Sequence, residues 1–235
     1  MESQYCKICN LFNSCEKSKN WADKKSVLAI QYIMASIGGY MGAYTLTAGL
    51  RFFGNAQTAN LIELIQSIVN TSPNDLTFHL IGLIIYILGL VLATVLPKKI
   101  GKTAMLLSPI IDISAFISMA ILEHSQHQML IVCIAFFAMS FQWVTFPEIN
   151  GYSSSTIFST NNLRQCVTAF TEYLCTHDKE MKHKGLYYLG TLISYNLSAG
   201  LYFILSYFFD NAILFGIFIS AIAFFVIFST NKNRK

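Results

Sequence analysis

Charged residues are scarce in this sequence. Asp, Glu, Lys and Arg make up 12% of its 235 residues, whereas soluble domains usually carry about a quarter. Hydrophobic residues make up 54% of the chain, and its mean hydropathy is +0.51. This composition excludes an ordinary soluble domain, so the length of the apolar runs decides the fold class.

Familiar catalytic motifs are also missing. The sequence has no phosphate-binding glycine loop, no H-E-x-x-H zinc pair and no G-x-S-x-G nucleophile turn. We therefore expect neither an enzyme nor a cofactor. The net charge of +4 comes mostly from a few lysine clusters, so we expect no nucleic-acid partner either.

The six cysteines do not form a recognisable disulfide set. Cys6, Cys9 and Cys15 lie in a polar tail that we place in the cytoplasm, where thiols stay reduced. Cys6 and Cys9 have the spacing of two zinc ligands, which Cys175 and His177 could complete. Solvated thiols on the tail are the preferred interpretation, and we predict no metal site.

Long apolar runs indicate a membrane protein. Residues 212–229, AILFGIFISAIAFFVIFS, carry no charge, and a membrane span needs roughly 20 apolar residues. Two helices at about 58–71 and 163–176 are too short or too polar to face lipid, because a charge at the bilayer centre costs about 2.5–3.5 kcal/mol. The six spans that we predict are residues 27–49, 79–97, 104–122, 129–146, 186–208 and 212–229.

Basic residues orient these spans. Lys and Arg favour short cytoplasmic loops, and here they cluster in the first 25 residues, near Lys99, near Lys182 and at the C-terminus. All clusters fall on one side if the six spans cross and the helices at about 58–71 and 163–176 do not. We predict a multi-pass membrane protein with cytoplasmic tails at 1–26 and 231–235. The first apolar run is long, so we expect a retained span and no cleavable signal.

Similar polar breaks precede the two non-crossing helices. Thr58–Asn60 aligns with Thr160–Asn162, and each triplet leads into a short helix and then two spans. The membrane domain at 27–230 thus divides into repeats at about 27–125 and 128–230. Each repeat has an odd number of spans, so the second enters the membrane with opposite polarity. Inverted repeats with discontinuous helices are typical of secondary transporters.

The triplets permit two interpretations. Threonine and asparagine can cap a helix start, so Thr58, Asn60, Thr160 and Asn162 could only cap helices and join the repeats. Alternatively, they also line a site, because the free N–H groups at a helix start favour an anion or a polar ligand. The short helices would then be re-entrant, with their N-termini buried in protein.

The first break also carries a family resemblance. Residues 38–64, GGYMGAYTLTAGLRFFGNAQTANLIEL, resemble the first signature of the YoaK-like family of small bacterial membrane proteins, a domain of unknown function (DUF1275). Members show G-x-x-D-A, then T-G-N leading into a helix, and a weaker T-G-N in the second half. Here Gly42 stands in place of the aspartate. The resemblance covers about residues 27–230 and implies a multi-pass cytoplasmic-membrane protein, without a substrate.

Two polar residues within spans complete the candidate site. Asp112 is the only acid well inside a predicted span; it either carries a coupling proton or bonds a neighbouring helix as a neutral acid. Gln142 roughly matches Gly42 in the repeat. Like Gln31 in the first span, it either lines a cavity or joins helices.

Together these features predict an all-α integral membrane fold with six transmembrane helices, two short re-entrant helices and two inverted three-span repeats. We expect a small-solute transporter or permease whose partners are the bilayer and a polar or anionic solute. A non-transporting sensor or assembly module is the alternative. The absence of the family's aspartate at Gly42 favours this alternative. The expected solute-binding residues are Thr58, Asn60, Thr160, Asn162 and Gln142, and Asp112 is the expected coupling-ion residue.

Overall fold

The computed structural model describes residues 21–47, 57–123, 128–146, 148–149 and 152–232. The α-helices among them are α2 Trp21–Thr47, α3 Gln57–Val69, α4 Pro73–Ile100, α5 Ala104–Leu122, α6 Gln128–Thr145, α7 Thr160–Thr176, α8 Lys179–Phe208 and α9 Gly216–Lys232. The 3-10 helices are η1 Gly101–Thr103 and η2 Ala212–Phe215, and the strands are β1 Glu148–Ile149 and β2 Tyr152–Ser153. The predicted all-α class is confirmed. Within the described ranges, the antiparallel β1–β2 pair is the one departure.

Six helical segments are long and apolar enough to cross a membrane. They are Lys25–Thr47, Pro73–Ile100, Ala104–Leu122, Gln128–Thr145, Lys179–Phe208 and Ala212–Lys232. The helices α3 and α7 have 13 and 17 residues and are not among them. A 13-residue helix is about 20 Å long, which is short of the roughly 30 Å hydrocarbon core. The six predicted spans are thus confirmed as helices long and apolar enough to cross, as in a multi-pass membrane protein.

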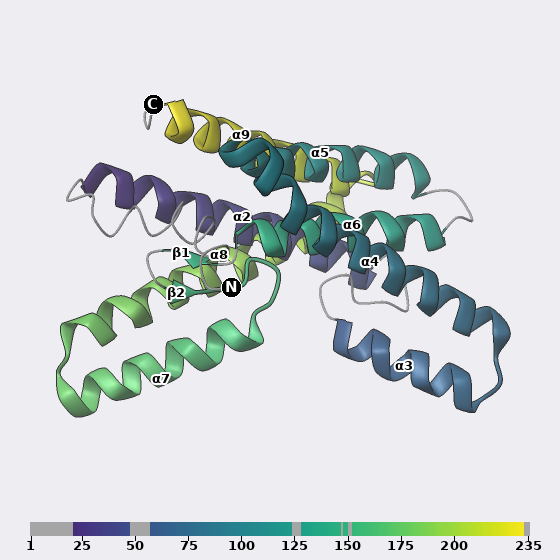
Figure 1. The fold of residues 1–235 in the computed structure, drawn as a ribbon, viewed down its shortest axis with the longest axis horizontal. Helices are drawn as coiled ribbons and strands as arrows, with labels where there is room; N and C mark the ends of the chain where they lie inside the picture. Colours follow the sequence, from purple (N-terminus) through teal and green to yellow (C-terminus); the bar gives the residue numbers. More distant parts are fainter. Residues whose placement is uncertain (1–20, 48–56, 124–127, 147, 150–151, 233–235) are drawn as a thin grey trace.

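The same order of helices occurs twice along the chain (Figure 1). In α2–α5 and again in α6–α9, a candidate membrane span is followed by a helix that is not one of the six, and this helix packs against the next candidate span, α3 on α4 and α7 on α8. The first helix of each set packs against the other set. Helix α2 packs mainly against α8 and α9, and α6 packs mainly against α4 and α5. Neither set of four helices therefore buries its own first helix.

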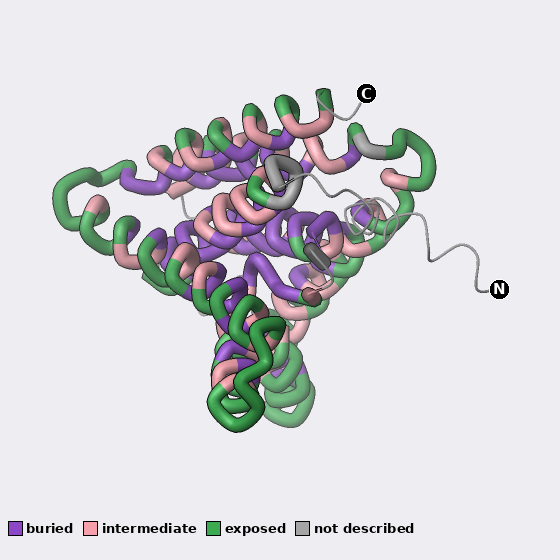
Figure 2. Tube along the Cα trace, turned by 90° about the vertical axis from the view of Figure 1, so that its left-hand side faces the viewer, coloured by how far each residue is buried: buried purple, intermediate pink, exposed green. Residues whose placement is uncertain are grey.

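The exchanged helices α2 and α6 lie at the centre of the bundle. About two-thirds (67%) of the apolar window of α2 and 56% of that of α6 are buried, against 17–33% for the other four segments. Figure 2 shows the buried residues gathered in the middle of the molecule. A Cβ added to Gly39 of α2 would clash with the carbonyl of Tyr195 on α8. Glycine thus lets the two backbones approach, as is common between membrane helices.

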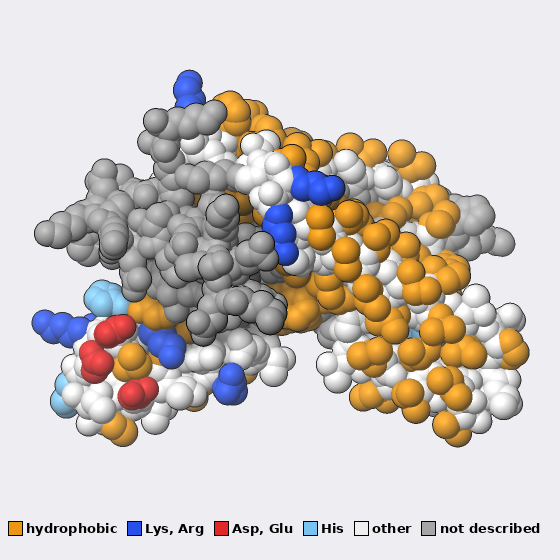
Figure 3. All heavy atoms as spheres, viewed as in Figure 1, with side chains coloured by type: hydrophobic (Ala, Val, Ile, Leu, Met, Phe, Trp, Pro, Cys, Tyr) orange, Lys and Arg blue, Asp and Glu red, His pale blue; other side chains and the backbone are white. Residues whose placement is uncertain are grey.

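The two short helices project from one side of the bundle with their turns at opposite ends (Figures 1 and 2). Their N-terminal ends consequently point toward each other in Figure 1. Charged side chains gather over the α7–α8 hairpin, whereas apolar side chains cover α3 and α4 (Figure 3). The apolar surface of α3 therefore suits lipid, which corrects the expectation that this helix is too polar to face lipid. The α7–α8 turn suits the polar boundary of a membrane. The exposed apolar residues of α3 are Leu61, Ile62, Ile65, Ile68 and Val69.

Candidate functional site

A buried, non-helical segment connects β2 to α7. We call residues 154–158 the break segment; the first four of them, Ser154, Ser155, Thr156 and Ile157, are 3%, 7%, 0% and 0% exposed. Irregular backbone at membrane depth is tolerated only inside protein or beside water, because lipid offers no hydrogen-bond partners. The polar groups of the break segment must therefore be satisfied within the molecule.

Asn162, on the first turn of α7, holds the break segment in place. Its Nδ2 donates to the carbonyl oxygens of Ser155 (2.7 Å) and Phe158 (2.9 Å). Its Oδ1 accepts from the hydroxyl of Ser154 (3.2 Å) and from the backbone N–H of Ser155 (3.3 Å). Asn162 is only 1% exposed. It lies at the break as predicted, and these four bonds give it a positioning role there.

Two glutamines join the break segment to the spans. Gln142 of α6 donates through Nε2 to the hydroxyl of Thr156 (2.8 Å) and to the carbonyl of Met34 on α2 (2.9 Å). Gln31 of α2 donates through Nε2 to the hydroxyl of Ser154 (3.0 Å). Both glutamines are 0% exposed, and their Oε1 atoms have no hydrogen-bond partner within the described residues. Segments from both sets of helices therefore meet in one polar cluster.

The predicted helix caps are wrong. Thr58 lies inside the first turn of α3, which begins at Gln57. Thr160 is the first residue of α7; the N-cap position belongs to Ser159, whose side chain makes no cap bond. Each threonine is thus past the cap position, and both are exposed at the helix ends that point toward each other. Asn60 is buried, at 6% exposure.

Asp112 lies apart from the break segment. It is on α5, which packs mainly against α9 and α6. Its side chain is 0% exposed, and neither carboxyl oxygen has a hydrogen-bond partner within the described ranges. The hydroxyl of Ser108, one turn earlier, is likewise buried and without a partner. The structure therefore does not bring Asp112 into the cluster formed by Gln31, Gln142 and Asn162.

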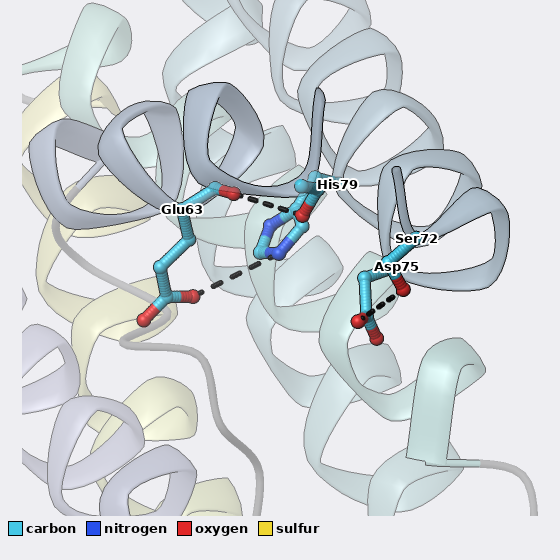
Figure 4. Close-up of polar contacts among 5 residues, drawn as sticks. Glu63, Ser72, Asp75 and His79 are labelled. Carbon is cyan, nitrogen blue, oxygen red and sulfur yellow. Dashed lines mark hydrogen bonds and ion pairs between the residues drawn. The ribbon is translucent and has the colours of Figure 1, made fainter. Parts of the chain in front are cut away.

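One acid–base pair links the first short helix to its neighbour. Oε2 of Glu63 on α3 lies 3.9 Å from Nε2 of His79 on α4 (Figure 4). The His79 side chain is 7% exposed and that of Glu63 is 40% exposed. At the adjoining turn, the Ser72 hydroxyl donates to Asp75 at 2.6 Å. These contacts join α3 to α4 across the turn between them.

The described residues include no group of three His, Cys, Asp or Glu side chains that could hold a metal ion. Cys6, Cys9 and Cys15 lie outside the described ranges. Cys175 is exposed on α7. Cys166, on the same helix, is buried, and its Sγ lies 3.6 Å from the carbonyl oxygen of Gly185. Burial raises the pKa of the Cys166 thiol.

Residues 30–227 match the family described as Protein of unknown function (DUF1275). The chain belongs to this family. The resemblance to DUF1275 that its first break suggests is thereby confirmed. No curated protein and no solved structure matches the chain.

The site of this DUF1275 protein includes residues that the sequence did not single out. Ser154, Ser155 and Thr156 belong to a serine- and threonine-rich run that has the composition of an ordinary surface loop. The signal that could have found them is their position directly before Asn162 and between two long apolar helices. The sequence marks Gln31 only as a polar residue within a span, because its partner Ser154 lies 123 residues away.

Proposed function

We propose that this DUF1275 protein is a transporter or permease for a small solute, with its site at the breaks between the two sets of helices. The buried break segment carries this proposal. A polar, non-helical segment inside a bundle of membrane-crossing helices costs folding free energy, so its presence points to a function. Transporters commonly place such segments near the membrane midplane to hold solutes and ions.

The exchanged packing of α2 and α6 supports the same proposal. Each set of four helices contains three crossing helices and one short helix, so consecutive sets start from opposite sides of the membrane. We infer an inverted repeat in which α3 and α7 are re-entrant. Lys98 and Lys99 at the end of α4, and Lys182 near the start of α8, then share the cytoplasmic side with both termini.

Within this proposal the candidate residues take different roles. Thr58 and Thr160 offer exposed hydroxyls at facing helix N-termini, where unpaired N–H groups favour a polar or anionic solute. Asn162 positions the break segment. Asn60 supports the start of α3, and Gln142 connects the break segment to α2.

Asp112 is the proposed carrier of a coupling proton. An ionised carboxylate buried in a span without a partner costs several kcal/mol, so a neutral carboxylic acid is the stable form in that surrounding. A carboxyl group that is neutral when buried and ionised when exposed to water can carry a proton across the membrane during an alternating-access cycle. Neither oxygen has a partner among the residues that the structure describes, which supports this role over a structural bond.

A solute screen tests the proposal. Purified full-length protein would be unfolded thermally against small carboxylates, amino acids, phosphate and nucleobases, and solutes that raise the midpoint saturably would be tested for counterflow in proteoliposomes. We expect one chemical class to give both responses. A folded protein that responds to no solute and co-purifies with another membrane protein would contradict transport. It would favour the sensor or assembly module.

A further inference from the structure

The side-chain orientation of Gln142 is fixed by its partners. The carbonyl oxygen of Met34 can only accept a hydrogen bond, and it lies 2.9 Å from the amide group of Gln142. The end of the Gln142 amide that faces Met34 must therefore be Nε2. Its Oε1 points elsewhere, and it is buried without a donor among the described residues.

A chain of donors and acceptors also fixes Gln31. The Nδ2 group of Asn162 faces two carbonyl oxygens, so its Oδ1 must be the acceptor for the Ser154 hydroxyl. That bond uses the only proton of the Ser154 hydroxyl. Ser154 must then accept from Gln31, which places Nε2 at the 3.0 Å contact and leaves Oε1 without a donor in the part of the chain that the structure describes.

The two unpaired oxygens belong to one neighbourhood. Gln31 and Met34 lie one turn apart on the same face of α2, and Nε2 of Gln142 touches the Met34 carbonyl. Ser154 and Thr156, the hydroxyl partners of the two glutamines, are two residues apart in the break segment. The cluster thus brings together several neutral oxygen atoms, two of which, the Oε1 atoms of Gln31 and Gln142, have no donor among the described residues. A buried acceptor without a donor costs about 1–3 kcal/mol, so an additional group should satisfy the two oxygens.

We propose that the carbonyl oxygens of Gln31 and Gln142 bind a small monovalent cation beside the break segment. Amide and hydroxyl oxygens are hard, neutral ligands that suit such an ion, whereas Ca²⁺ and Mg²⁺ sites draw on carboxylates. No Lys or Arg side chain shares a hydrogen bond with the two glutamines in the described residues. This site is distinct from Asp112. Its use as a coupling-ion site rests on the proposed transport function, but the binding itself does not.

Thermal unfolding of the purified full-length protein in choline chloride, NaCl, KCl and NH₄Cl at equal ionic strength tests this binding. Because an ion that binds only the folded state stabilises it by mass action, we expect a saturable rise of the midpoint with at least one small cation over choline. Gln142→Met and Gln31→Met should each raise the half-saturating cation concentration on the order of tenfold. Gln66→Met, on the exposed face of α3, should leave it unchanged.

Equal midpoints in all four chlorides would overturn the proposal and leave a buried water as the occupant. A cation response that both Met variants retain in full would overturn it too, because the ion would then bind elsewhere. If a Met variant does not fold, Gln31→Glu replaces it: an added carboxylate should lower the half-saturating concentration. Cation binding without any solute counterflow would contradict the transport function alone.

Discussion

Gly38 of α2 lies directly against the carbonyl oxygen of Thr156, so close that even a Cβ would clash. This contact seats the break segment on the central helix. Gly38→Ala should lower the free energy of unfolding by about 1–3 kcal/mol, because the backbone of Thr156 cannot move aside as a flexible side chain would. Thermal unfolding in detergent measures the loss.

Gly200 provides the matched control for that substitution. A Cβ at Gly200 of α8 meets no atom within 4 Å, so Gly200→Ala should be neutral or stabilise by up to about 1 kcal/mol through reduced backbone freedom. Equal effects of the two substitutions would show that the break segment does not rest on Gly38.

Asn162 and Asn161 make a second matched pair. Asn162→Ala would remove the donor to the buried carbonyl of Ser155 and the partly buried carbonyl of Phe158, which should cost about 2–4 kcal/mol of stability. Asn161 is exposed, and its side chain accepts only from Arg164 in the described contacts. Asn161→Ala should therefore change the unfolding midpoint little. Comparable midpoints for the two variants would contradict the positioning role of Asn162.

Asp112→Asn tests the coupling role. If the enclosed side chain is a neutral acid without a partner, a neutral amide of the same shape should fold with an unfolding midpoint close to that of the wild type. Proton-driven uptake of the transported solute should be lost, and Asp210→Asn, at an exposed residue, should retain it. A destabilisation of about 3–5 kcal/mol by Asp112→Asn would instead indicate a buried, partnered charge.

The thiols of α7 test how this helix sits on α8. Burial raises the pKa of the Cys166 thiol, so less of it is thiolate at neutral pH. In variants that retain one cysteine, Cys175 should react quickly with a maleimide. Cys166 should react slowly until the protein is denatured, and its labelling should speed up as the pH rises. Rapid labelling of both thiols in folded protein would mean that α7 does not pack on α8 as described.

Much of the fold follows from local sequence. Long apolar runs are sufficient to locate all six crossing segments, and the T-N-N triplet correctly marks the start of α7 at Thr160. The contact that seats the break segment could not be predicted, because Gly38 lies more than a hundred residues away from it in the sequence. The cap assignments failed for a different reason: a threonine inside the first turn has the same composition signal as one at the cap.

Residue accessibility from outside intact cells tests the central claim, which is that six helices cross and the two sets enter from opposite sides. In a cysteine-free background, single cysteines would replace Asn74, Gln128, Lys99 and Glu180, which are all exposed. We predict that a membrane-impermeant maleimide labels positions 74 and 128 and reaches 99 and 180 only after the membrane is permeabilised. Labelling of position 99 in intact cells would mean that α3 crosses the membrane. The inverted repeat, and with it the main support for transport, would then be wrong.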